Sequence, residues 1–191
     1  KDKFFKEKMS NFHSQYKSGD LNLKAYVELL LSPIMGMQVK EIENKIKPFA
    51  RKVTENLTDD VTLSLLLKHQ EHDCIVVSGT LSFLVKEISK NLGIRTYFGT
   101  DPEIKNKRFT GRILGKPNFE NEKVVRVKNW INSKDHYFKE IYAYSDSIYD
   151  LPMLDFSTKA IALDPDAKLR KECEKKKLGN YREKKNHNLI Y

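Results

Sequence analysis

Two aspartates stand four residues apart in the stretch YAYSDSIYDLPML, directly after an apolar and aromatic run. Asp146 and Asp150 carry carboxylates, which can bind a hard divalent cation or hold a lysine in place. The same pattern also fits a helix start, in which the first aspartate caps the helix and the second lies in its first turn. The two aspartates therefore indicate a metal site only if other polar groups are expected close to them.

Two further places carry polar side chains after apolar runs. Ser78, Gly79 and Thr80 end the stretch CIVVSGT, where a hydroxyl and free amides at a helix start can hold a phosphate-like anion. Lys123 lies near the start of a predicted helix, where the helix dipole does not favour a cation. An ordinary helix cap and a surface lysine are the alternative interpretations.

The elements that would position these residues change in character along the chain. From Phe4 to about Gln70 the pattern is helical, with breaks expected at residues 17–20, at residues 33–36 and at Pro48. From Cys74 onward, short apolar runs alternate with amphipathic segments, which is typical of an α/β fold with a parallel sheet and crossover helices. Ligands of such sheets bind at the carboxyl ends of the strands, where all three polar places lie.

Local signals refine this α/β pattern. Thr58 is expected to cap a helix that starts at DDVTLSLLL, and the apolar spacing over residues 81–92 predicts a crossover helix that stops at Gly93. Residues 105–115 alternate and contain turn residues, so we expect a small hairpin there.

Composition limits the class of protein. The chain has 191 residues, 39% hydrophobic and 32% charged, with no apolar run long enough to cross a bilayer, so we expect one core with a smaller lobe and no membrane partner. Cys74 and Cys173 are far apart in unlike surroundings, which favours a reducing compartment and predicts a cytoplasmic protein. The sequence indicates no oligomeric state.

The order of the polar places resembles a known family. S-G-T, then Lys123, then D-S-x-x-D-L-P-M-L is similar to motifs two, three and four of the haloacid dehalogenase superfamily, in its phosphoserine-phosphatase-like branch. The stretches FTGRILGKPNFENEKVVRVKNWI and IALDPDAKLRKECEKKKLGN resemble other parts of that branch, and YKSGDLNLKAYVELLLSPIMG resembles its helical cap. The resemblance implies a Rossmann-like core over residues 57–191 and a helical cap over residues 1–56.

The resemblance also implies an activity. It suggests a hydrolase of phosphomonoesters that depends on Mg²⁺ and acts on a small phosphorylated metabolite, with phosphoserine and histidinol phosphate as candidates. Ser78 and the Gly79 amide, with Thr80, would bind the phosphoryl group, and Lys123 would neutralise its charge. These are groups that phosphoryl transfer requires.

The remaining implied roles belong to the two carboxylates. Asp146 would bind the Mg²⁺ ion, and Asp150 would support that metal site and hold Lys123. Two residues depart from the family pattern, because Ser145 stands where a glycine is usual and Tyr149 where an asparagine is usual.

The family's first motif is the third departure. D-x-D-x-T/S, which carries the nucleophilic aspartate of a phosphoaspartyl intermediate, does not follow any apolar strand before Cys74. We therefore expect the first core strand and the nucleophile upstream of Lys1, and an inactive protein if they are truly missing.

An alternative of another class is a catalytically silent relative whose basic surface binds nucleic acid or an acidic partner. The net charge of +9 and the lysine-rich segment over residues 168–185 motivate it. The basic residues are scattered and lack interleaved exposed aromatics, so nucleic acid is not the expected partner.

Overall fold

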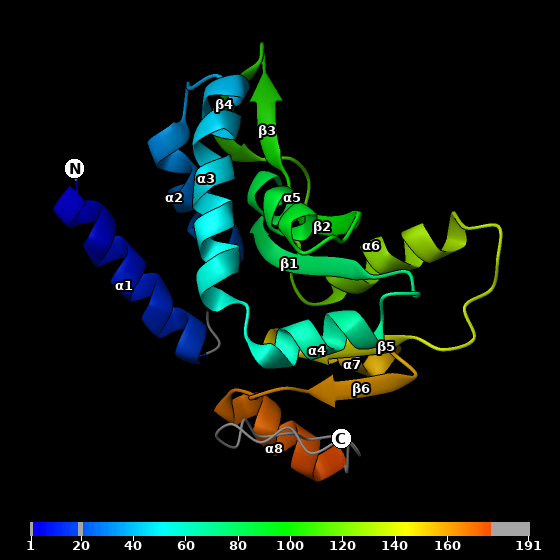
Figure 1. The fold of residues 1–191 in the computed structure, drawn as a ribbon. Helices are drawn as coiled ribbons and strands as arrows, with labels where there is room; N and C mark the ends of the chain where they lie inside the picture. Colours follow the sequence, from blue (N-terminus) through cyan, green and yellow to red (C-terminus); the bar gives the residue numbers. More distant parts are fainter. Residues whose placement is uncertain (1, 19–20, 177–191) are drawn as a thin grey trace. The chain divides into compact units, whose positions relative to one another are not determined.

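The computed structural model describes residues 2–18 and 21–176, which form one compact unit within residues 1–118 and another within residues 119–191. Figure 1 shows the helices and strands of both units, and each unit is described here by itself. Residues 19–20 of the expected first break and the lysine-rich segment after Lys176 lie outside the described residues.

The first unit places helices before a strand, helix and strand sequence. Its elements are α1 (Asp2–Ser18), α2 (Leu23–Leu31), η1 (Ser32–Ile34), α3 (Val39–Leu57), α4 (Asp60–Lys68), β1 (Ile75–Leu81), α5 (Ser82–Asn91), β2 (Thr96–Thr100), β3 (Pro102–Lys105) and β4 (Arg108–Ile113). Strands β1 and β2 pair in parallel, with Ile75 opposite Thr96, and α5 is the crossover between them. Helix α5 gives way to Gly93 at φ +74°, which confirms the expected stop.

Two predictions about the helices are wrong. Pro48 lies inside α3 and does not break it, although an internal proline costs a helix about 3 kcal/mol. The amphipathic α3 buries Ile42 and Ala50 on either side of the proline, and this packing offsets the local cost. The break near Pro33 is confirmed, because α2 ends there and Gly36 has a φ of +81°.

The second wrong prediction concerns the start of α4. Thr58 closes α3 as its C-terminal cap, and Asp59 is the cap of α4. The Asp59 carboxylate accepts hydrogen bonds from the Thr62 amide at 2.9 Å and the Thr62 hydroxyl at 2.8 Å. A carboxylate suits this position because it also faces the positive end of the helix dipole.

The expected hairpin is present as β3 and β4, and it begins at Pro102, three residues earlier than predicted. Its turn residues Asn106 and Lys107 both have positive φ, as the two-residue turns of twisted hairpins require. The hairpin is tied to the segment after η1, since the Gly36 amide donates to the Phe109 carbonyl at 2.8 Å.

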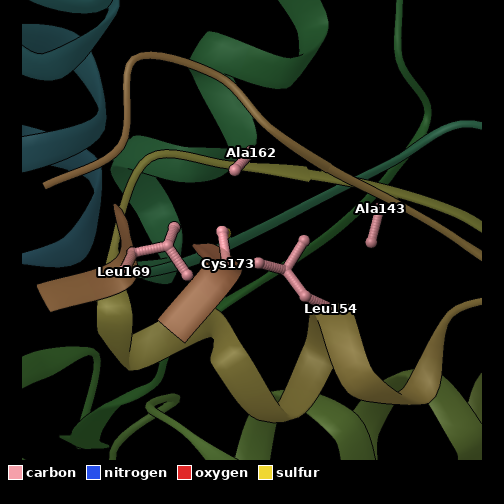
Figure 2. Packing of buried hydrophobic residues seen from close by; sticks show 5 residues of the cluster. All are labelled: Ala143, Leu154, Ala162, Leu169 and Cys173. Atoms are coloured by element: carbon pink, nitrogen blue, oxygen red, sulfur yellow. The ribbon is translucent and has the colours of Figure 1, made fainter. Parts of the chain in front are cut away.

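The second unit has the same alternation of helix and strand. Its elements are α6 (Asn121–Asn132), β5 (Tyr142–Ser145), η2 (Ile148–Asp150), α7 (Leu151–Phe156), β6 (Lys159–Ala162) and α8 (Ala167–Lys176). Strands β5 and β6 pair in parallel with Tyr142 opposite Lys159. The buried cluster of this unit joins both strands to α7 and α8, as Figure 2 shows, through Ala143, Leu154, Ala162, Leu169 and Cys173.

The observed architecture confirms the predicted α/β class with parallel strand pairs and crossover helices. The boundary expected between a cap over residues 1–56 and a core over residues 57–191 stays a prediction. None of the helices that the structure describes is long and apolar enough to span a membrane.

Candidate functional site

The first candidate group lies at the carboxyl end of β1. Ser78, Gly79 and Thr80 belong to the last residues of the strand, which continues to Leu81 because Leu81 pairs with Thr100 of β2. The register of the pair shifts between Val77 and Leu81, so the strand is irregular at this point. The Thr80 amide donates to the Ser78 hydroxyl at 3.2 Å, and Thr80 is exposed.

A buried asparagine holds this strand end. The Asn118 side-chain amide donates to the carbonyl of Ser78 at 2.8 Å and to that of Phe98 at 3.1 Å. Asn118 is fully buried, and its backbone amide donates to the Thr100 hydroxyl at 2.9 Å. The Thr100 hydroxyl in turn donates to the Gly79 carbonyl at 2.8 Å. The carbonyls of Ser78 and Gly79 are thus fixed by two side chains from outside the strand.

Gly99 lets β2 approach this strand end closely. A Cβ atom at this position would lie 2.6 Å from the Ser82 Cα and 2.8 Å from the Thr80 carbonyl oxygen. Any larger residue would therefore push the two strands apart where the candidate anion-binding amides lie.

The second candidate group begins with Lys123, the third residue of α6. Lys123 is 7% exposed and forms an ion pair with Asp150 at the end of η2. The helix that carries the lysine starts after Glu120, whose φ of +47° and ψ of −124° are rare for a residue with a side chain. A buried lysine needs a partner charge, and Asp150 supplies it.

Both oxygens of the Asp150 carboxylate are engaged. Oδ1 accepts from Lys123 Nζ, and Oδ2 accepts from the Ser145 hydroxyl at 2.7 Å. The Ser145 oxygen also accepts from the Ser147 amide at 3.1 Å. Ser145, which replaces the glycine usual in this motif, therefore helps to hold Asp150 against the lysine.

Asp146 is in a different state from Asp150. Asp146 is exposed and directly follows β5, and its carboxylate makes no hydrogen bond or ion pair with the described residues. No three His, Cys, Asp or Glu side chains of the described chain gather in a way that could hold a metal ion. Mg²⁺ commonly takes one or two protein carboxylates and completes its shell with water and phosphate oxygens, so the donor set of Asp146 with Asp150 fits this ion.

Tyr149 is the second departure from the resembled motif, in which an asparagine is usual. Its side chain is 9% exposed and lies edge-on to Phe119, with ring centroids 6.4 Å apart. The substitution therefore replaces an amide with an aromatic side chain that packs inside the unit.

A cavity of about 660 Å³ lies elsewhere in the second unit. It is lined by Ile141 and Thr158, which precede β5 and β6, and by lysines such as Lys128 and Lys134. These residues lie at the amino ends of the parallel strands, whereas Asp146 follows the carboxyl end of β5. We therefore do not assign the cavity to the chemistry of the candidate site.

The structure thus brings Asp150 into direct contact with Lys123 and with Ser145, and Asp146 follows Ser145 in the chain. Ser78, Gly79 and Thr80 lie in the other unit. Sequence reasoning missed Asn118 and Thr100, because asparagine and threonine are mostly exposed and neither lies in a motif that signals burial.

Comparison with known proteins gives consistent matches. The family model described as haloacid dehalogenase-like hydrolase matches residues 8–155. A histidinol-phosphatase of Neisseria meningitidis is 27% identical over 171 residues, which cover 86% of this chain and 77% of that protein. A phosphoserine phosphatase of Archaeoglobus fulgidus is 26% identical over 159 residues, which are 83% of this chain and 44% of that protein.

A solved structure is also similar over most of the chain. A protein of unknown function from Bordetella pertussis superimposes with a TM-score of 0.81 and 28% identity, covering 92% of this chain and 81% of that one. The likeness in fold therefore extends well beyond the motif residues.

Proposed function

This chain belongs to the haloacid dehalogenase-like hydrolase family, and from that premise we propose that it hydrolyses phosphomonoesters of small metabolites. The observation that carries the proposal is the ion pair of the buried Lys123 with Asp150, which stands four residues after the exposed Asp146. A fixed cation in the same unit as an exposed carboxylate suits a phosphoryl group together with a divalent metal.

In this proposal Lys123 stabilises negative charge on the phosphoryl oxygens. Its ammonium group is removed from bulk water, so its field is screened less than that of a surface lysine. Asp150 and Ser145 orient the side chain before substrate binds, which lowers the cost of reorganisation during the reaction. The Ser78 hydroxyl, the Gly79 amide and Thr80 are proposed to hydrogen-bond phosphoryl oxygens.

We propose Mg²⁺ as the metal, with Asp146 as its protein ligand and Asp150 as the residue that supports this site. When bound, Mg²⁺ would neutralise charge on the phosphoryl oxygens as a Lewis acid. Because both oxygens of Asp150 already accept hydrogen bonds, Asp146 is the stronger candidate for direct contact with the ion.

The proposed reaction also needs a nucleophile. We propose an aspartate of a D-x-D-x-T/S motif that precedes Lys1 in the natural protein. Its carboxylate oxygen would attack phosphorus, the second aspartate would give the leaving alcohol a proton, and water would then hydrolyse the phosphoaspartyl intermediate.

The candidate substrates are histidinol phosphate and phosphoserine. The names of the Neisseria and Archaeoglobus relatives support these two molecules, and the Neisseria protein is matched over the larger share of its length. We further propose that the protein acts in the cytoplasm, since both cysteines are free thiols.

Phosphate release from a panel of phosphomonoesters tests the proposal. The full-length protein should release inorganic phosphate from histidinol phosphate or phosphoserine with Mg²⁺, lose that activity in EDTA, and regain it when Mg²⁺ is restored. Asp146→Asn should lose most of the activity, because a neutral amide binds Mg²⁺ poorly.

The matched control is Asp155→Asn, which removes another exposed carboxylate of the same unit, one that pairs with Lys176 at 2.6 Å. This variant should keep its activity. A full-length protein that releases no phosphate from any substrate in the panel would contradict the proposal.

A further inference from the structure

Asp166 lies between β6 and α8, outside all the residues assigned to the site so far. Its carboxylate accepts three backbone hydrogen bonds from two different segments. Oδ1 accepts from the amides of Lys168 and Leu169 at 2.9 and 2.8 Å, and so caps the first turn of α8. Oδ2 accepts from the Ile148 amide at 2.8 Å, at the start of η2.

The hydrogen bond from the Ile148 amide to Oδ2 joins Asp166 to the segment that carries both proposed metal-site aspartates. Ile148 lies two residues after Asp146 and two residues before Asp150. The backbone on the other side of Asp146 is also tied down, because the Leu163 amide donates to the Ser145 carbonyl at 2.9 Å. The Asp166 amide itself donates to the Asp146 carbonyl at 2.7 Å.

Packing fixes the same point from within the unit. The Ile148 side chain packs against the buried cluster that contains Leu154 and Leu169. The Ile148 residue is therefore held by its side chain against the core and by its amide against Asp166. The exposed Asp146 side chain has no comparable support of its own among the described residues.

We propose that Asp166 is a positioning residue, which fixes the backbone of residues 146–150 so that the Asp146 carboxylate is presented to a divalent cation. The inference rests on the proposed function, and it adds a residue that neither contacts substrate nor binds the metal. A single side chain would link the cap of α8 to the metal-binding segment. Residues of this kind, which orient a metal ligand indirectly, commonly change metal affinity by about ten- to a hundredfold.

Asp166→Asn separates the two tasks of the side chain. Asparagine is a good helix cap, so its single oxygen can still serve α8, but its NH₂ group cannot accept a hydrogen bond from the Ile148 amide. Asp166→Ser is a second variant that also keeps a capping oxygen and is too short to serve both segments. The matched control is Asp59→Asn, which makes the same change in the cap of α4.

Two measurements on the full-length protein decide the inference. Mg²⁺ titration by calorimetry should show a dissociation constant about tenfold higher or more in Asp166→Asn, with Asp59→Asn close to wild type. Hydrogen exchange of the Ile148 amide should become at least about tenfold faster in Asp166→Asn and Asp166→Ser, because that amide loses its acceptor. Thermal unfolding should remain cooperative in all variants.

Equal Mg²⁺ affinity in Asp166→Asn and wild type would overturn the inference, and so would unchanged exchange at Ile148. A wild-type protein that binds no Mg²⁺ would instead remove the metal from the proposed function. In that case the Ile148 exchange rate alone would decide whether Asp166 fixes the segment.

Discussion

The ends of β1 and β5 are held in place by different chemistry. At β1 the stabilising side chains, which we call braces, are uncharged: the Asn118 amide and the Thr100 hydroxyl donate hydrogen bonds to strand carbonyls. At β5 they are charged, since Lys123 pairs with Asp150, and the Asp166 carboxylate accepts from the Ile148 amide. Both sets of braces come from residues far away in the sequence.

This difference matches what each strand end is proposed to bind. Amides offered to an anion need a backbone of fixed shape, and neutral donors that occupy the carbonyls provide it without adding charge. A cation site needs carboxylates of fixed orientation, and here the ion pair of Asp150 and the hydrogen bond from the Ile148 amide to Asp166 hold the segment that carries them. We infer that support by residues from outside the motif is a shared feature of both strand ends.

The largest expected effect is at Lys123. Lys123→Met should lower phosphatase activity by a factor on the order of 10², as the loss of a stabilising donor does at other sites. It should also lower the free energy of unfolding by about 3 kcal/mol, because Asp150, with its side chain 17% exposed, loses its cation. Activity assays and urea unfolding measure the two effects.

A double variant separates stability from catalysis. Lys123→Met combined with Asp150→Asn removes both charges and should recover most of the stability without recovering activity. Recovery of activity in the double variant would show that the lysine serves only the fold.

The next effect tests the neutral brace at β1. Asn118→Ala removes two hydrogen bonds to the partly buried carbonyls of Ser78 and Phe98 and should cost about 2 kcal/mol in urea unfolding. The control is Asn91→Ala, whose exposed side chain donates to the Thr54 hydroxyl at 3.4 Å and should matter little. If the two variants lose equal stability, then Asn118 does not brace the strand end.

The smallest effect concerns how the helix after each strand end begins. Helix α5 starts from Leu81 in an ordinary conformation, whereas α6 starts from Glu120 at φ +47°. Glu120→Gly should therefore raise the free energy of unfolding by about 1 kcal/mol, because glycine adopts this conformation without strain. Glu120→Ala keeps a Cβ atom and should give no such gain, so an equal gain in both variants would argue against backbone strain.

The strands and crossover helices could be predicted because their apolar spacing reflects burial, which is written locally in the sequence. The same holds for the hairpin and for the stop at Gly93. Pro48 was misjudged because the packing of α3 on both sides of it outweighs a local penalty. Thr58 was misjudged because Asp59, one residue later, is the better cap.

The residues of the candidate site also fall into those that the sequence could predict and those that it could not. Ser78, Lys123, Asp146 and Asp150 could be named because motif spacing marks them. Asn118 and Asp166 could not, because their contacts join segments 40 and 18 residues apart, and those contacts exist only once the chain has folded. The sequence marks Ser145 only as a departure from the motif, because its hydrogen bond to Asp150 forms once the chain has folded.

The most direct test of the account is a crossed kinetic measurement on Ser78→Ala and Asp146→Asn in the full-length protein. We predict that Ser78→Ala raises KM for the phosphorylated substrate and leaves the Mg²⁺ activation constant unchanged. Asp146→Asn should raise that activation constant by about tenfold or more. Equal shifts of both constants in both variants, or activity that does not depend on Mg²⁺, would contradict the assignment of an anion site to β1 and a cation site to β5.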